Sequence, residues 1–147
     1  MQLDIVSDLH IDYWDAKLGT KHAPDRIKHA PLNWKDKPKS NILIIAGDIA
    51  DDLQISLDYA NKLTQYYQHV LFIDGNHEHM KKYPSLYQHD FIRMMVNFYQ
   101  NEKLIYLTNN IFIKNRIAFI GCCGWWDFMG EYQDNSKNIL SKLLQYF

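Results

Sequence analysis

Residues 41–52 read NILIIAGDIADD, and residues 69–80 read HVLFIDGNHEHM. In each stretch a continuous apolar run, Ile42–Ala46 or Val70–Ile73, gives way at once to a glycine and polar side chains. Continuous apolar runs of this length suit strands that are covered on both faces, as in parallel sheets. Each stretch therefore predicts a buried strand that delivers polar groups at its carboxyl end.

The segment between these two runs has the spacing of a helix. A helix is predicted over residues 52–67, with Leu57 and Ala60 on its buried side, and either Asp51 or Asp52 can cap its start. A strand, a helix and a strand in this order form a βαβ unit, for which a right-handed crossover is expected. The predicted fold class is therefore α/β.

Further elements are predicted on both sides of this unit. A strand is expected over Met1–Ser7, and a helix is expected after Pro84, where Ser85 and Gln88 match a capping box. The buried stripe of that helix is predicted to be Phe91, Met94, Met95 and Phe98. Three short strands are predicted next, with a turn at Asn115 between the last two: Leu104–Tyr106, Ile111–Ile113 and Ile117–Ile120. A last helix is predicted over Gln133–Phe147.

The composition indicates one domain over residues 1–147. With 47% hydrophobic and 22% charged residues, the chain can build a core and is not disordered. A net charge of −1 argues against dedicated binding of nucleic acid or membrane surfaces. No apolar run is long enough for a membrane span, and no signal-peptide pattern is present. The adjacent Cys122 and Cys123 cannot cross-link distant segments, so a cytoplasmic location is predicted.

Residues 11–40 are predicted to be a basic, proline-containing loop within this domain. Between Lys17 and Lys39, seven Lys or Arg stand against two Asp, which gives the stretch a charge of +5. Two interpretations stay open. The loop is either a solvated segment whose charges keep it soluble, or a guide for an anionic substrate beside an acidic body.

Polar side chains follow three of the predicted strands. Asp8 and His10 follow the first, Asp48 follows the second, and Asn76 and His77 follow the third. The carboxyl ends of parallel strands lie at one edge of a sheet, where ligands bind in open α/β folds. Oxygen and nitrogen ligands of this mix suit Mn, Fe, Zn or Mg rather than copper. Each cluster alone is common in ordinary turns, so the prediction depends on the ordered set.

The order Asp8-x-His10, Gly47-Asp48 and Gly75-Asn76-His77-Glu78 resembles the calcineurin-like metallophosphoesterase family. The stretch IAFIGCCGW at residues 117–125 is also similar to a strand and tight turn of that family. The resemblance covers most of residues 1–128. It implies layered β-sheets flanked by helices, incomplete at the C-terminus, and a hydrolase that acts on phosphomonoesters or phosphodiesters.

The resemblance also implies a dinuclear centre of two divalent metal ions, Mn, Fe, Zn or Mg. Asp8 and His10 would bind the first ion, and Asp48 would bridge both ions. Asn76 would bind the second ion and help to orient the phosphate, while His77 would be the catalytic residue beside the leaving-group oxygen. A metal-bound hydroxide would attack the phosphorus atom.

The sequence departs from the family pattern in two places. A further histidine and a Gly-His-x-His motif normally complete both sites, but no histidine of this chain follows His89. The second site is therefore expected to be weak. No arginine follows Gly47-Asp48, which disfavours the protein Ser/Thr phosphatases. Glu78 is expected to support its loop rather than to contact substrate.

The other histidines are possible substitutes for the missing ligands. His22 and His29 lie in the basic loop, where histidines are usually solvated, and His79 lies next to the third cluster. His69 and His89 are expected to be structural or exposed.

Three hypotheses about function remain open. The chain is an active phosphoesterase, a truncated and weakly metal-binding or inactive remnant that acts as an interaction module, or a half-domain completed by another chain. The third predicts self- or hetero-association through the apolar face of the Gln133–Phe147 helix, which has no stop signal after it.

Overall fold

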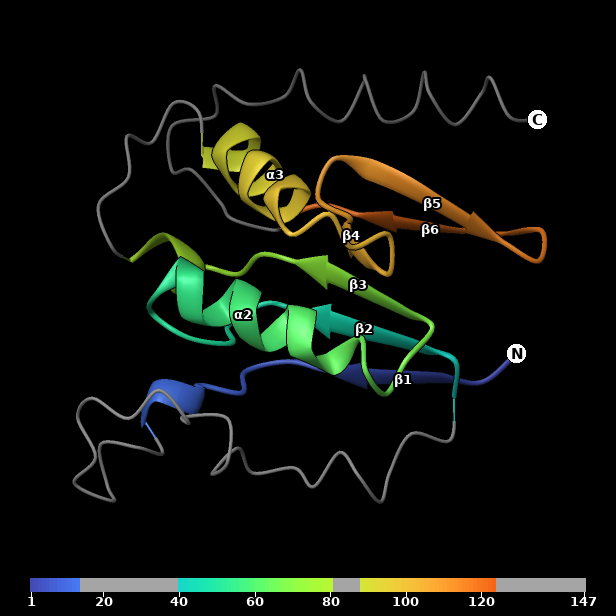
Figure 1. The fold of residues 1–147 in the computed structure, drawn as a ribbon, viewed down its shortest axis with the longest axis horizontal. Helices are drawn as coiled ribbons and strands as arrows, with labels where there is room; N and C mark the ends of the chain where they lie inside the picture. The colour runs from blue at the N-terminus through green and yellow to red at the C-terminus, as the bar shows by residue number, and fades with distance from the viewer. Residues whose placement is uncertain (14–39, 81–87, 124–147) are drawn as a thin grey trace.

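The computed structural model describes residues 1–13, 40–80 and 88–123 (Figure 1). The strands are β1 (Leu3–Val6), β2 (Ile42–Ala46), β3 (His69–Ile73), β4 (Leu104–Tyr106), β5 (Asn110–Lys114) and β6 (Ile117–Gly121). The helices are α2 (Leu53–Leu63), the short 3-10 helix η3 (His77–His79) and α3 (Gln88–Phe98). All six predicted strands are confirmed, with small shifts at their ends.

Four of the strands form one parallel sheet in the order β1-β2-β3-β4. Val6 pairs with Ile45, and Ala46 pairs with Ile73, so the carboxyl ends of β1, β2 and β3 lie almost level. These three strands point the same way in Figure 1. The predicted α/β fold with a βαβ unit is thereby confirmed, and the three polar clusters follow the same edge of the sheet.

Helix α2 begins as the sequence predicts. Asp52 is its N-cap, and the carboxylate accepts hydrogen bonds from the backbone N–H groups of Gln54 and Ile55. Leu57 and Ala60 are fully buried in the main core on this face of the sheet. Capping thus fixes where the helix starts, and the apolar stripe fixes which side faces the sheet.

The end of α2 differs from the prediction, because the helix stops at Leu63 and not at residue 67. The Thr64 N–H donates to the carbonyl of Asn61, which tightens the last turn and ends the helical pattern. Tyr67 nevertheless stays buried beyond the helix, and its hydroxyl donates to the carboxylate of Asp4 at 2.9 Å. The apolar spacing therefore extends further along the chain than the helix does.

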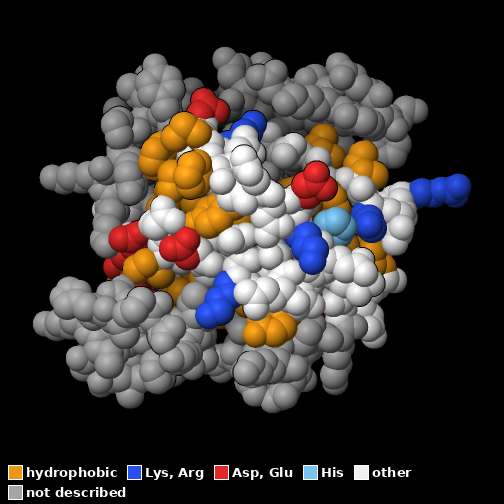
Figure 2. Space-filling model, viewed as in Figure 1, with side chains coloured by type: hydrophobic (Ala, Val, Ile, Leu, Met, Phe, Trp, Pro, Cys, Tyr) orange, Lys and Arg blue, Asp and Glu red, His pale blue; other side chains and the backbone are white. Residues whose placement is uncertain are grey.

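The buried side of α3 also differs from the prediction. Ile92 and Val96 are the buried residues, whereas Met94 and Phe98 are 58% and 84% exposed, so the predicted stripe is wrong at these two positions. Met94 and Phe98 lie on the opposite side of the helix from Ile92. Figure 2 shows apolar side chains at the surface over this helix. The two other predicted positions pack partly against the core: Phe91 and Met95.

Strands β5 and β6 form an antiparallel hairpin that packs on the other face of the sheet. Phe119 is buried against Leu71 of β3, with Phe112 beside it. Asn115 and Arg116 join the strands with φ values of 52° and 63°, the left-handed pair that a tight hairpin turn requires. The predicted turn at Asn115 is confirmed.

Some predicted features lie outside the described residues. They are residues 14–39 of the basic loop, the Ser85 position of the capping box, Trp125 and the helix over Gln133–Phe147. Within the described start of the predicted loop, residues 11–13 are helical and Ile11 is buried. Among the helices of the described segments, none has the length and apolar character needed to cross a membrane.

Replacing Leu57 with alanine should destabilise the fold by about 2–5 kcal/mol, because the side chain is fully buried and its removal leaves a cavity. Urea unfolding followed by circular dichroism measures this change. The matched control is Ile5→Ala, because Ile5 is 65% exposed and its truncation should stay within about 0.5 kcal/mol. Equal losses in the two variants would contradict the assigned core.

Candidate metal centre

The loops that follow β1 and β2 are joined side by side by backbone hydrogen bonds. The N–H of His10 donates to the carbonyl of Asp48 at 3.1 Å, and the N–H of Ile11 donates to the carbonyl of Ile49 at 2.8 Å. These bonds continue the parallel pairing beyond the ends of the strands. They place His10 next to Asp48.

Three of the predicted ligand residues have unusual backbone conformations. Asp8, His10 and Asp48 have φ values of 53°, 42° and 58°. Residues other than glycine rarely adopt this left-handed region, although aspartate and histidine do so more readily than most. Such conformations persist only where the surrounding structure enforces them, and they cluster at functional sites. The backbone conformation at this edge of the sheet therefore sets the direction of these three side chains.

Gly47 and Gly75 allow the loops after β2 and β3 to touch. A Cβ atom on Gly47 would lie 2.7 Å from the Cα of Gly75, and one on Gly75 would lie 2.2 Å from a carboxylate oxygen of Asp48. Gly47 also has a φ of 77°. Both positions exclude any side chain, because real Cβ atoms do not approach other atoms so closely. The two glycines let Asp48 lie against the third loop.

The carboxylate of Glu78 ties the same two loops together. It is 1% exposed, and one of its oxygens accepts from the N–H groups of Asp48 at 2.9 Å and Gly75 at 2.8 Å. The other oxygen accepts from the N–H of Ile49 at 2.7 Å and the hydroxyl of Ser56 at 3.0 Å. The structure therefore confirms that Glu78 supports the loop.

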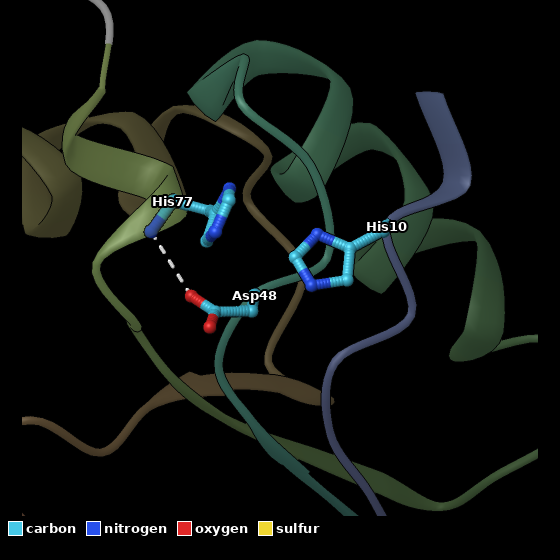
Figure 3. A group of neighbouring side chains, drawn as sticks. All are labelled: His10, Asp48 and His77. Carbon is cyan, nitrogen blue, oxygen red and sulfur yellow. Dashed lines mark hydrogen bonds between the residues drawn. The ribbon is translucent and has the colours of Figure 1, made fainter. Parts of the chain in front are cut away.

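His10 and Asp48, on the loops after β1 and β2, converge with His77 at the start of η3 (Figure 3). One potential ligand atom from each lies within 4.8 Å of the other two. The rings of His10 and His77 meet edge to face with their centroids 4.4 Å apart. The backbone N–H of His77 donates to the Asp48 carboxylate at 2.9 Å. All three side chains are half-buried, so they form a shared site that is open on one side.

The donors of this group suit a divalent metal ion. Nδ1 of His10 is buried and has no hydrogen-bond partner, which is costly for a polar atom unless something binds it. Nδ1 of His77 is occupied by Asp51, which leaves Nε2 for another partner. Imidazole and carboxylate groups, as His10 and Asp48 provide, are ordinary ligands of Zn, Mn and Fe. The residues present therefore fit a metal of this class.

Asp51 sets the orientation of His77. One of its carboxylate oxygens lies 2.6 Å from Nδ1 of His77, and the other accepts from the hydroxyl of Tyr13 at 3.0 Å. The hydrogen bond to Asp51 raises the pKa of His77, and the bond to His77 lowers the pKa of Asp51. The hydrogen bond to Asp51 also raises the pKa of Tyr13. Carboxylates in this position fix the ring and its tautomer.

The structure brings together three of the five predicted site residues: His10, Asp48 and His77. Asp8 lies on the same loop as His10, but it is exposed and is not part of this group. Asn76 immediately precedes η3 and is exposed, and its side chain makes no capping hydrogen bond to that helix. The metal-binding roles of these two residues stay predictions.

Sequence reasoning missed the part that Asp51 and Tyr13 take in the site. The sequence suggests Asp51 only as a helix cap, a role that Asp52 fills. One signal for Asp51 is present in the sequence. Asp51 lies three positions after Asp48, on a loop that already carries one candidate ligand. Tyr13 is 38 residues away from Asp51, and no sequence pattern joins the two.

Comparison with known proteins gives one match. A family model described as calcineurin-like phosphoesterase matches residues 1–143. No curated protein and no solved structure matches the chain.

Replacing Glu78 with glutamine should lower the stability of the fold by about 1–3 kcal/mol. In the native protein, backbone N–H groups donate to both oxygens of the Glu78 carboxylate. In the variant, the amide NH₂ group would replace one of these oxygens, and the N–H groups that face it would lose their acceptor. Thermal and urea unfolding measure the loss. The matched control is Glu102→Gln, because Glu102 is exposed and its replacement should change little. A Glu78 variant as stable as the control would show that the buried carboxylate does not hold the loops.

Proposed function

The chain belongs to the calcineurin-like phosphoesterase family, and we propose that it hydrolyses phosphate esters with divalent metal ions held at the candidate metal centre. The observation that carries this proposal is the convergence of His10, Asp48 and His77 at one edge of the sheet. The partnerless Nδ1 of His10 supports it further. A fold-stabilising cluster would be expected to satisfy that nitrogen from within the protein.

Four residues would hold the ions and orient the substrate in this proposal. Asp8 and His10 would bind the first ion, Asp48 would bridge the two ions, and Asn76 would bind the second ion and orient the phosphate. When bound, such ions neutralise the charge of the phosphoryl oxygens and activate a water molecule for in-line attack at phosphorus. Mn, Fe, Zn and Mg all suit this donor set.

His77 would protonate the leaving group in this proposal. Asp51 holds Nδ1 of the ring at 2.6 Å and fixes its orientation, which leaves Nε2 as the nitrogen that can deliver a proton to the substrate. The Nε2 side of the ring would then face the scissile ester. As the bond between phosphorus and the ester oxygen breaks, the proton passes from His77 to that oxygen, and the product leaves as a neutral alcohol.

A second candidate function is a metal-binding remnant without catalysis. Two observations favour it: no histidine follows His89 in this sequence, and Asp8 does not join the group formed by His10, Asp48 and His77. Fewer protein ligands mean a weaker site and a less fixed geometry. The two functions differ in measurable ways, because a remnant keeps the fold and loses turnover.

The experiment is hydrolysis of para-nitrophenyl phosphate and bis-para-nitrophenyl phosphate with Mn²⁺, compared between the native protein and Asp48→Asn. We expect native turnover of at least one substrate and a decrease of roughly 100-fold or more in the variant, because the bridging charge is lost. Asparagine also tolerates the left-handed backbone at this position, so the fold should persist.

The matched control is Asp90→Asn, an exposed carboxylate on α3, which should keep native activity. Native mass spectrometry with Mn²⁺ separates the two candidate functions. Bound metal without hydrolysis of either ester would support the remnant and overturn the enzyme, whereas equal activity in the native and Asp48 proteins would refute the proposed centre.

A further inference from the structure

A second group of potential ligands lies beside the candidate metal centre. It consists of Asp74 at the end of β3, His79 on η3 and His89 on α3. One potential ligand atom from each lies within 4.8 Å of the other two. None of these residues belongs to the group of His10, Asp48 and His77. The two groups are separate but meet on η3, which carries both His77 and His79.

The Asp74 carboxylate has one fixed oxygen and one oxygen shared between two histidines. Its side chain is fully buried, and Oδ1 accepts from the hydroxyls of Tyr106 at 2.7 Å and Thr108 at 2.5 Å. Oδ2 lies 2.5 Å from Nε2 of His79 and 3.5 Å from Nδ1 of His89. The hydroxyls thus orient the carboxylate so that Oδ2 lies between the two imidazoles.

His79 carries a buried polar atom that the protein leaves without a partner. Its side chain is 13% exposed, and its Nδ1 has no hydrogen-bond partner. The rings of His79 and His89 meet edge to face with centroids 5.8 Å apart. Cys123 also interacts with His79, but its sulfur is not one of the three grouped ligand atoms. The potential ligand atom of His79 is the other ring nitrogen, Nε2, which faces Asp74.

We propose that Asp74, His79 and His89 form a second site for a divalent metal ion of the zinc type. Two imidazoles, one carboxylate and an open fourth position are a common zinc ligand set. Ligand atoms around a tetrahedral ion at zinc distances lie about 3.3 Å apart. The Asp74–His89 pair already has that spacing, and the Asp74–His79 pair needs only to open slightly as the ion replaces the proton between them.

The site also has the outer support that metal ligands require. Tyr106 and Thr108 hold the oxygen of Asp74 that faces away from the histidines, and carboxylate ligands are normally anchored in this way. Nδ1 of His89, the ligand atom, lies 3.0 Å from the Tyr106 hydroxyl, a contact that the ion would replace. His89 is 40% exposed at its side chain, which leaves a side through which an ion can enter. The ion would cross-link β3, η3 and α3.

The experiment is a titration of the full chain with Co²⁺. The chain carries His10→Ala, which removes one ligand of the candidate metal centre so that binding at the second group can be measured. Tetrahedral Co²⁺ absorbs visible light, and ligation by Cys123 would add a thiolate charge-transfer band. We expect one ion per chain, displaced by Zn²⁺. Adding His89→Gln should weaken binding by at least about tenfold. Adding His69→Gln instead should leave it unchanged, because His69 lies outside both groups.

Histidine NMR spectra of the His10→Ala protein locate the ion even if the His89 variant fails to fold. We expect Zn²⁺ to shift the ring signals of His79 and His89 and to leave those of His69 in place. No bound ion in the His10→Ala protein, or an ion that perturbs neither His79 nor His89, would overturn the proposal. Binding that His89→Gln leaves unchanged would overturn it as well. Neither readout measures phosphate ester hydrolysis. The result of this test is therefore independent of whether the proposed function is correct.

Discussion

The buried carboxylate of Glu78 holds the ends of two neighbouring strands together. It accepts from the N–H groups of Asp48 and Ile49 after β2 and from the N–H of Gly75 after β3. These groups lie where the parallel ladder has ended, so the sheet cannot satisfy them. A buried carboxylate without such donors would be strongly unfavourable. The loops and Glu78 therefore depend on each other, and the placement of the candidate metal centre depends on both.

The rest of the site follows from this close approach of the loops. Strand ends that lie level bring the loops to one edge, and the two glycines remove the side chains that would keep them apart. The left-handed conformations of His10 and Asp48 carry a local energetic cost, which the backbone hydrogen bonds between their loops offset. The result is an edge of the sheet on which imidazole and carboxylate groups converge.

The sequence predicted the sheet well because its signals are local. The runs Ile42–Ala46 and Val70–Ile73 and the glycines after them identify strands and turns without knowledge of the fold. The buried side of α3 was harder, because apolar residues occur around much of this helix and only tertiary packing selects Ile92 over Met94. The contact of Tyr13 with Asp51 and the meeting of His79 with His89 join distant segments, so no local pattern could have revealed them.

The short helix η3 explains why two groups of ligands lie so close together and yet stay separate. A 3-10 helix has about three residues per turn, so consecutive side chains point in three different directions. His77 joins Asp48 and His10, Glu78 enters the core between the loops, and His79 joins Asp74. Because Glu78 pins the middle of this turn, neither histidine can move far without breaking buried hydrogen bonds. The two histidines therefore share one short turn, which Glu78 anchors between them.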